Sequence, residues 1–399
     1  MAGALDGIRV LDLTSVVMGP MATQILGDLG ADVITIESAR GETNRAMGPG
    51  PHPALSGTSL NLLRSKRNIA LDLKHPDGRE ALMRLAATCD VFVTNLRPSS
   101  LRRLRLTYDE VRDARPDLVY CQAQGFPAGT DRADDPAYDD IIQSATGVAD
   151  AARRAYGEPR LVPTLVADKV AGLTIVYAVL AALFHRERSG EGQHIEVPMT
   201  QAMTAFMLVE HGAGGVPQPP AGPAGYQRIL TPERRPQRTA DGWINVLPYS
   251  TEQYDTLFAA GGREDLLGDV RYADGRARIA NSDFLYQQVR AILAQRTTDE
   301  WLAFCRDNQI PAAPVITLEE LLAEQPVMTH PLAGNYHHVR PGARLTATPM
   351  RASRPAPLPG QHNHEVLKEA GYSDDDIDDL LTRGVLRSLG SRVHRSPAG

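Results

Sequence analysis

The alternation of apolar and polar residues near the start of the chain predicts two strands with a helix between them. Residues 7–14 and 32–37 alternate as half-buried strands do, and a Gly-Pro pair opens a predicted helix over 21–29. A strand, a helix and a strand in this order predict a parallel pair joined by a right-handed crossover.

The same alternation of strand and helix patterns continues through the first half of the chain. Further strands are predicted at 69–74, 91–95, 117–123 and 193–199, with helical patterns between them. This order predicts an α/β fold with a doubly wound parallel sheet.

A long apolar run begins directly after Asp168 and predicts a helix that is buried on most of its circumference. The next acidic residue is Glu187. Two interpretations of Asp168 stay open at this point. It caps the helix by accepting backbone N–H groups, which the spacing alone favours, or it is a nucleophile or base held ionised by the positive helix end.

The length of the chain, 399 residues, exceeds one ordinary core and predicts two domains. A glycine- and proline-rich stretch predicts a linker, and a strand and helices after it predict a compact α+β unit. The expected parts are a large domain at 1–211, the linker at 212–225, a small domain at 226–325, a loop-rich and then helical part at 326–387, and a disordered tail at 388–399.

The composition is typical of a soluble globular protein, with 42% apolar and 23% charged residues. A net charge of -6 argues against nucleic acid as the main partner. Cys89, Cys121 and Cys305 are odd in number and far apart, which favours neither disulfides nor zinc and predicts a cytoplasmic protein. No signal peptide is visible, and the best membrane candidate, 170–183, is too short to span a bilayer, so no membrane partner is expected.

Glu37 ends the second predicted strand and raises the question of dinucleotide binding. The turn at 14–20 lacks the G-x-G-x-x-G pattern, so neither NAD nor FAD is expected.

Two groups of residues indicate ligand chemistry. Basic residues near predicted strand ends suit a phosphorylated ligand, although a solvated basic surface is the alternative for each: Lys66, Arg67, Lys74, Arg97 and Arg103. The second group, in 135–144, places Tyr138 and two acids ahead of a helix, and a capping role explains one of these acids.

Taken in order, segments from residue 5 to about 386 resemble the family III CoA-transferases, which include formyl-CoA:oxalate transferase, carnitine CoA-transferase and α-methylacyl-CoA racemase. No single segment is unique, but the ordered set is specific. The matching segments are 5–13, 29–37, 66–74, 95–98, 138–139, Asp168 with its helix, 189–193, 240–243 and 359–362.

The resemblance implies a large Rossmann-like domain made from both ends of the chain, with a smaller domain inserted between them. It also implies a homodimer in which two ring-shaped subunits interlock. The implied substrates are an acyl-CoA and a small carboxylic acid, with no metal or redox cofactor.

In these transferases an aspartate at the position of Asp168 attacks the acyl-CoA thioester. Attack gives an aspartyl–acyl anhydride, and the released CoA thiolate then attacks the aspartyl carbonyl to store CoA as an enzyme thioester. The incoming acid repeats the sequence in reverse. By position, the resemblance assigns CoA contacts to Val17, Met18, Leu71, Asp72, Leu73, Lys74, Asn95, Leu96, Arg97, Arg103, Pro136, Ala137, Tyr138 and Asp139.

An alternative within the same family is racemisation of a 2-methylacyl-CoA by proton transfer. The racemases carry a histidine where this chain has Tyr138, and tyrosine, with an ordinary pKa of about 10, suits that chemistry poorly. The transferase is therefore favoured, and a non-catalytic CoA-binding subunit is a weaker alternative.

The acid itself is not specified by the resemblance. Formyl-CoA transferase has glutamine at the position of Val17 and a glycine-rich loop in the small domain, and this chain shows no counterpart of that loop. Candidates for binding the acid's carboxylate near the domain junction are Tyr226, Arg228, Arg234, Arg235 and Arg238.

Overall fold

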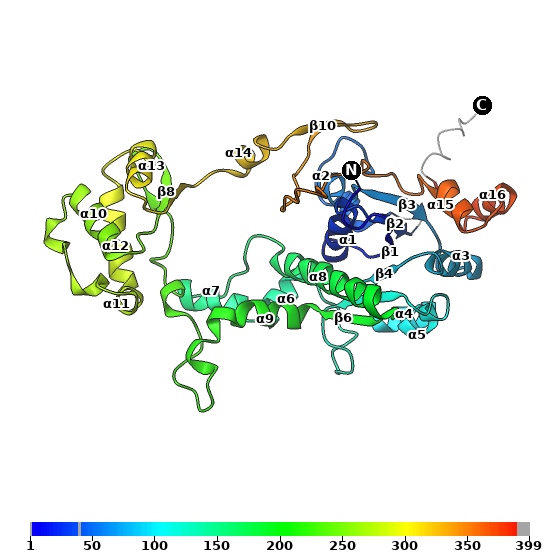
Figure 1. The fold of residues 1–399 in the computed structure, drawn as a ribbon, viewed down its shortest axis with the longest axis horizontal. Helices are drawn as coiled ribbons and strands as arrows, with labels where there is room; N and C mark the ends of the chain where they lie inside the picture. Colours follow the sequence, from blue (N-terminus) through cyan, green and yellow to red (C-terminus); the bar gives the residue numbers. More distant parts are fainter. Residues whose placement is uncertain (1, 39–40, 389–399) are drawn as a thin grey trace. The chain divides into compact units, whose positions relative to one another are not determined.

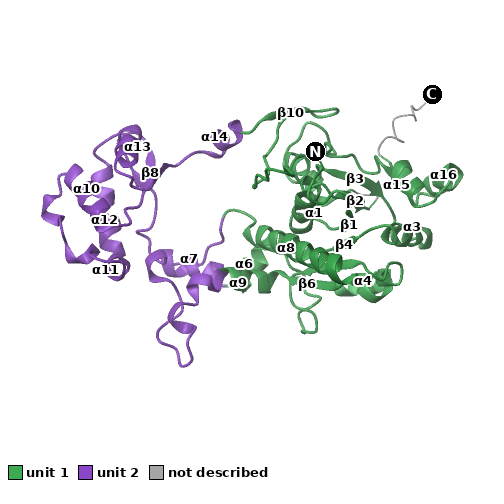
Figure 2. Ribbon diagram, viewed as in Figure 1, with its two compact units in different colours: residues 1–146, 163–206, 325–399 green, residues 147–162, 207–324 purple. Residues whose placement is uncertain are grey.

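The computed structural model describes residues 2–38 and 41–388 and divides into two compact units. Unit 1 comprises 1–146, 163–206 and 325–399, and unit 2 comprises 147–162 and 207–324 (Figure 2). Residues 147–162 and 207–211, which the sequence assigns to the large domain, cluster with unit 2. The predicted tail at 389–399 lies outside the described residues.

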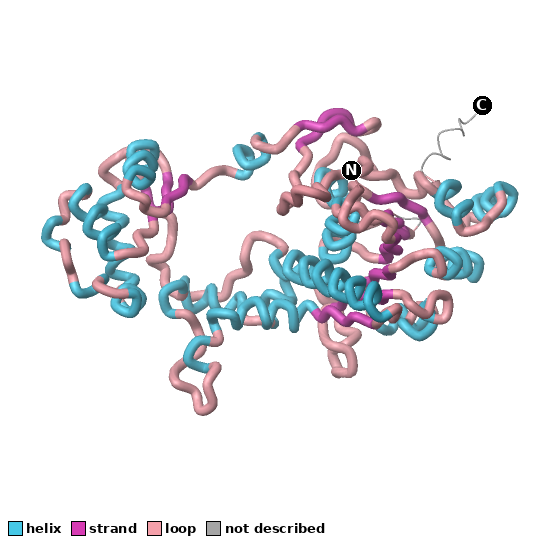
Figure 3. The backbone as a smooth tube through the Cα atoms, viewed as in Figure 1, coloured by secondary structure: helices cyan, strands magenta, loops and turns pink. Residues whose placement is uncertain are grey.

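Unit 1 is built on a parallel sheet of six strands in the order β3-β2-β1-β4-β5-β6. This is the strand order of the Rossmann fold, and it confirms the predicted α/β class. Figure 3 shows the strands gathered in the middle of unit 1 with helices to either side. The strands are β1 (Arg9–Leu13), β2 (Asp32–Glu37), β3 (Lys66–Ala70), β4 (Val91–Thr94), β5 (Val119–Gln124) and β6 (His194–Pro198).

Helices from both ends of the chain complete unit 1 (Figure 1). Side chains of α3, α4, α5, α15 and α16 share one core with the strands. The C-terminal part is joined to β3, where the Asn363 side chain accepts the N–H of Ala70 at 3.1 Å. The helices are α1 (Met18–Asp28), α2 (Gly57–Leu62), α3 (Pro76–Ala86), α4 (Pro98–Leu104), α5 (Tyr108–Arg112), α6 (Asp139–Ala145), α8 (Val166–Ser189), α9 (Met199–His211), α15 (Asn363–Glu369) and α16 (Asp374–Thr382).

Helix α8 differs from its prediction in length and in burial. It has 24 residues, and of the described helices it alone is long and apolar enough to cross a membrane by those two criteria. The prediction that this run is too short to span a bilayer is therefore wrong. One face packs on α1, α6 and the sheet, but Leu173, Tyr177 and Phe184 are more than half exposed on the other. The helix is thus not buried on most of its circumference.

Unit 2 has its own core around a three-stranded antiparallel sheet, β7 (Gln237–Arg238), β8 (Trp243–Val246) and β9 (Ala312–Pro314). The predicted strand and helices of this unit are confirmed. Its helices are α7 (Val148–Tyr156), α10 (Thr251–Ala260), α11 (Gly275–Ala280), α12 (Ser282–Leu293), α13 (Thr298–Asp307) and α14 (Leu318–Ala323).

Two strand predictions need correction. The third strand begins at Lys66 and ends at Ala70, so most of the predicted 69–74 strand follows it as a loop. The region after 326, predicted as loop, contains a hairpin of β10 (Val327–His330) and β11 (Gly334–His337).

Candidate active site

The loop between β1 and α1 lies at the carboxyl edge of the sheet and is held by Asn95, which directly follows β4. The side chain of Asn95 donates from Nδ2 to the Ser15 carbonyl and accepts the Ser15 N–H at Oδ1, both at 2.9 Å. Strands β1 and β4 are neighbours, so the fold brings Asn95 beside the predicted residues Val17 and Met18. Both of these side chains are buried. Any contact of Val17 or Met18 with a ligand would therefore be made mainly by the backbone.

Val16, in the same loop, adopts a left-handed conformation with φ of 70°. A β-branched residue is strained there, and such strain persists only where neighbours hold it. Glu42 Oε1 accepts the Val16 N–H at 2.7 Å, and Asn44 Nδ2 donates to the Val16 carbonyl at 3.4 Å. The sequence analysis missed Val16 and Glu42, because no spacing signals a strained valine.

The predicted residues 71–74 follow β3 at the same edge. Asp72 Oδ1 accepts the Lys74 N–H at 2.9 Å and forms the turn that leads into α3. Asp72 and Lys74 are exposed. Leu71 is buried and its N–H is bonded to the Glu37 carbonyl, so neither its side chain nor its N–H is available to a ligand.

Helix α4 brings the predicted Arg97 and Arg103 to this edge together with the loop that follows β5. Arg97 directly precedes α4, and both arginines are exposed. Asp134 joins the loop to the helix: it accepts the Ser99 N–H at 2.7 Å and the Arg102 guanidinium at 2.9 Å.

Three of the five predicted cations suit a phosphate and two do not. Within residues 2–38 and 41–388, Lys74, Arg97 and Arg103 form no ion pair. Lys66, by contrast, is fully buried, with Nζ 3.0 Å from Asp12 Oδ2. Arg67 pairs with three carboxylates, those of Asp32, Glu365 and Glu369. Both Lys66 and Arg67 start β3 at the opposite edge, so their predicted part in phosphate binding is wrong.

Asp168 is the third residue of α8 and does not cap it. Asp139, at the start of α6, accepts the N–H groups of Ala167 and Asp168 at Oδ1, at 2.7 and 3.1 Å. Its Oδ2 accepts the Gln143 amide at 2.6 Å. The cap interpretation of Asp168 is therefore wrong. The capping role expected for an acid of 135–144 at its own helix is also wrong, because α6 has no side-chain cap and Asp139 caps α8 instead.

The Asp168 side chain is buried, and no described residue donates a hydrogen bond to its carboxylate. Burial, followed by the negative charge of Asp139, raises the pKa of Asp168 to about 7. The expectation that donors at the helix start keep this carboxylate ionised is wrong, because Asp139 occupies those donors. Asp168 is consequently poised between its protonated and ionised forms near neutral pH.

Gly172, one turn beyond Asp168, sets the approach of α8 to the first turn of α1. A Cβ at this position would lie 2.8 Å from the Met18 carbonyl oxygen, too close for a side chain. The two helices contact each other, and Figure 1 shows α1 next to α8 in unit 1. Asp168 therefore lies close to the loop that carries Val17 and Met18.

The predicted segment 136–139 is brought to the same place by α6. Ala137 packs against the end of β5, where a Cβ on Gly125 would meet it at 2.2 Å. Tyr138 precedes α6 and is 65% exposed. Asp139 is buried with both oxygens bonded, so a CoA contact at this residue would involve its main chain.

The other ionisable groups considered are either paired with neighbouring side chains or held in their neutral form by burial. Glu37, the acid at the end of β2, is buried and paired with Arg45 and with the Asn68 amide. Burial raises the pKa of Cys89 and of Cys121 to about 12. No group of three or more His, Cys, Asp or Glu side chains within 2–38 and 41–388 is arranged to hold a metal ion. Among these groups Asp168 has the ionisation best suited to nucleophilic or proton-transfer chemistry.

Comparison with known proteins places these observations in a family. The model of CoA-transferase family III matches residues 5–363. The succinate–glutarate CoA-transferase of Agrobacterium fabrum is 34% identical over 388 residues, covering 92% of this chain and 95% of the relative. The formyl-CoA:oxalate CoA-transferase of Streptomyces coelicolor is 30% identical, covering 96% and 100%. A CaiB/BaiF family protein of Brucella suis superposes with a TM-score of 0.79 at 26% identity, covering 93% and 100%.

Proposed function

The chain belongs to CoA-transferase family III and is a CoA-transferase, and we propose that Asp168 is the nucleophile that carries CoA from an acyl-CoA to a free carboxylic acid. The observation that carries the proposal is the buried Asp168 carboxylate. It lies one turn before the glycine at which α8 meets the start of α1, and no described residue donates a hydrogen bond that would weaken its nucleophilicity.

Each step of the proposed reaction is an acyl transfer, in which a bond from a carbonyl carbon to oxygen or sulfur forms as another one breaks. An ionised Asp168 oxygen attacks the thioester carbonyl, the C–S bond breaks, and an aspartyl–acyl anhydride forms with CoA thiolate as leaving group. The thiolate attacks the aspartyl carbonyl, which releases the first acid and leaves an aspartyl-CoA thioester. The carboxylate of the second acid then attacks this thioester, the C–S bond breaks, and a new aspartyl–acyl anhydride forms with release of CoA thiolate. The thiolate attacks the carbonyl of the new acyl group, which gives the new acyl-CoA and frees the Asp168 carboxylate.

CoA binding is assigned to the residues gathered at the same edge of the sheet. The 3′-phosphate and the diphosphate are proposed to bind Lys74, Arg97 and Arg103, since these cations are exposed and unpaired within the described ranges. The β1–α1 loop, residues 71–73, Asn95 with Leu96, and residues 136–139 provide the remaining contacts.

Racemisation is the second candidate, and one observation favours it: a pKa of about 7 suits Asp168 as a proton carrier. Its partner group would be Tyr138, at the position where the racemases of this family carry histidine, and a phenol suits general acid–base catalysis near neutral pH less well than an imidazole does. The transferase is therefore the better proposal. As the acid we propose a short dicarboxylic acid, because the Agrobacterium fabrum relative is named for succinate and glutarate.

We further propose that the protein is a cytoplasmic homodimer of interlocked ring-shaped subunits. The support for a homodimer is an apolar stripe on α8, which consists of Leu173, Tyr177, Leu180 and Phe184. All of these residues except Leu180 are exposed. Three buried, unpaired cysteines fit a reducing compartment.

The test incubates the protein with succinyl-CoA and a panel of free acids and follows new thioesters by mass spectrometry. A parallel reaction in heavy water follows deuterium at Cα of a 2-methylacyl-CoA. We expect exchange without deuterium uptake, and loss of exchange in Asp168→Asn. Deuterium uptake without exchange would overturn the choice in favour of racemisation.

A further inference from the structure

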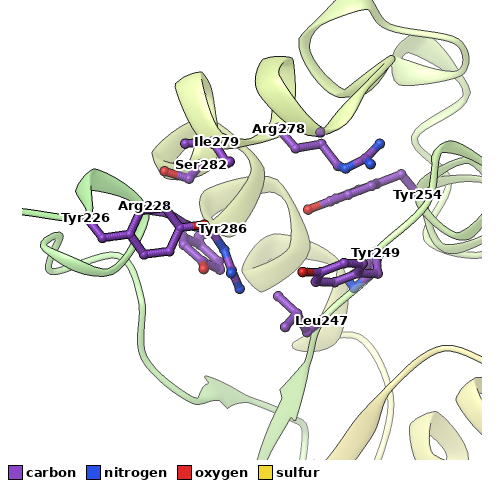
Figure 4. Close-up of a pocket in the computed structure, with 11 residues that line it drawn as sticks. Tyr226, Arg228, Leu247, Tyr249, Tyr254, Arg278, Ile279, Ser282 and Tyr286 are labelled. Atoms are coloured by element: carbon purple, nitrogen blue, oxygen red, sulfur yellow. The ribbon is translucent and has the colours of Figure 1, made fainter. Parts of the chain in front are cut away.

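Unit 2 contains a pocket of about 110 Å³ that is remote in sequence from Asp168 (Figure 4). Its walls come from Tyr226 and Arg228, from residues 247–249 after β8, and from the helices α10, α11 and α12. This volume is below the range of about 300–1,000 Å³ that is typical of pockets for drug-sized ligands, so the pocket suits a small group.

The charged side chains that line this pocket are two arginines. Arg228 and Arg278 form no ion pair with any residue in 2–38 or 41–388, and no acidic side chain lines the pocket. Elsewhere in unit 2, Arg271 and Arg290 each pair with a carboxylate. The pocket thus keeps two positive charges without an internal counter-ion, which favours an anionic ligand.

Tyrosine side chains line the pocket together with the two arginines, and Arg278 Nη1 also donates to the Tyr272 carbonyl at 3.0 Å. Burial acts to lower the pKa of Arg228, and hydrogen bonds with the phenols of Tyr226 and Tyr286 outweigh it and raise the pKa. Burial raises the pKa of Tyr254 to about 12, and the charges of Arg278 and Arg228 oppose that rise. Both arginines therefore lie close enough to the Tyr254 phenol to affect its pKa. In Figure 4 Arg228 lies beside Tyr226 and Tyr286, whereas Arg278 lies on the side of Tyr254.

The remaining wall is apolar and suits a short carbon chain better than an inorganic anion. Leu247, Pro248 and Ile279 line it together with the faces of the tyrosine rings. The Ser282 hydroxyl adds one further hydrogen-bonding group. A planar guanidinium fork matches the geometry of a carboxylate, and apolar contacts match its carbon stem.

We propose that this pocket binds the carboxylate end of a small organic acid between Arg228 and Arg278. Two of the five residues expected from the sequence to bind a carboxylate, Tyr226 and Arg228, line it, and the other three do not. The bound carboxylate belongs either to a reacting substrate or to a separate acid that does not react, and the experiment distinguishes these sources.

The binding test uses the full chain carrying Asp168→Asn, so that no turnover occurs, and calorimetry at constant ionic strength with succinate, acetate and phosphate. Arg228→Gln and Arg278→Gln are each expected to weaken succinate binding about tenfold or more, as loss of a charged hydrogen bond does. Arg276→Gln is the matched control: it removes the same charge from the same helix two residues away, does not line the pocket, and should stay within twofold. Melting temperatures monitor the fold, and Ser282→Ala provides a milder variant.

Succinate binding that survives both arginine variants would overturn the proposal, as would phosphate binding more tightly than succinate. Exchange kinetics without the Asp168 change then identify the source. If the acid is a substrate, Arg278→Gln raises its KM by the factor seen in binding, and if it is a separate acid, every KM stays unchanged. The binding test requires no transfer activity, so a failure of the proposed reaction leaves this inference standing, and the reverse also holds.

Discussion

Asp139 caps the helix that presents Asp168, and in doing so it sets the chemistry of that carboxylate. Its Oδ1 accepts the N–H of Asp168 itself at 3.1 Å, so the helix-start donors face Asp139 and not the Asp168 side chain. The buried carboxylate of Asp168 then lies near a second negative charge, and its pKa is raised to about 7. Only the ionised form can attack a thioester.

The rate of CoA exchange is therefore expected to depend on pH through Asp168. As the pH falls below about 7, kcat/KM should decrease about tenfold per pH unit, because the ionised fraction decreases. The measurement is a pH–rate profile with a fixed acyl-CoA and acid between pH 5 and 9. A profile that stays flat down to pH 5 would contradict the assigned ionisation.

The control for this profile is Asp139→Asn, which keeps an oxygen to cap α8 but removes the charge. Without that charge the pKa of Asp168 decreases, so the acid limb should move to lower pH. Asp139→Ala also removes the cap and should lower the free energy of unfolding by about 1 kcal/mol.

Burial of Asp168 should also make the wild-type protein less stable at high pH than Asp168→Asn. Its pKa is about 7 in the folded state and about 3.8 when unfolded, so between these values the folded state holds the extra proton. The free energy of unfolding contributed by this group therefore decreases as the pH rises from about 4 to 7 and is constant above that.

At 1.36 kcal/mol per pH unit, the free energy of unfolding of Asp168→Asn should exceed that of the wild type by at most about 4 kcal/mol. Denaturant titrations at pH 5 and pH 8 measure it. If the difference in free energy of unfolding between Asp168→Asn and the wild type were the same at both pH values, the pKa of Asp168 would not be raised.

The parts of the fold that the sequence predicted are those set by local pattern. The alternation of apolar residues located the strands, and the apolar run after Asp168 located α8. The third strand was misplaced because Lys66, a polar residue at its start, is buried through pairing with Asp12, 54 residues earlier. Likewise, the cap of α8 comes from Asp139, 29 residues before Asp168, and no local spacing reveals such a contact.

Most residues of the candidate site could be predicted from the sequence, but the role of each residue could be predicted less well. The resemblance supplied Asp168, Asn95 and the cations, and the fold brings these segments to one edge of the sheet. The strained Val16 and its partner Glu42 left no sequence signal. The exposed side of α8 was predicted as buried, because apolar composition does not reveal which face is covered.

Loss of a cation at the sheet edge should weaken binding of the CoA moiety. Lys74→Ala and Arg97→Ala are each expected to raise the KM for acyl-CoA about tenfold, with little change in kcat, as loss of one charged phosphate contact would. Arg84→Ala is the control, since Arg84 is exposed but lies late in α3 and pairs with Glu80. Unchanged KM values in both variants would contradict the phosphate assignment.

The β1–α1 loop should lose its shape when Asn95 is shortened. Asn95→Ala removes both bonds to Ser15, so we expect a higher KM for acyl-CoA and about 1–3 kcal/mol less stability. Val16→Gly relieves the strained conformation and should keep the stability within about 1 kcal/mol of wild type. Steady-state kinetics and denaturant unfolding test both variants, and normal kinetics in Asn95→Ala would exclude this loop from the site.

The apolar stripe on α8 is expected to be covered by a second copy of the chain. If so, Tyr177→Glu places a charge in an apolar interface, and an unpaired buried charge costs several kcal/mol. Light scattering after size exclusion should then report a single chain of 43.3 kDa in place of a dimer of twice that mass. Tyr156→Glu is the control, because Tyr156 is 53% exposed but lies on α7. A wild-type protein that is monomeric at micromolar concentration, or a Tyr177→Glu variant that stays dimeric, would show that this face is not the interface.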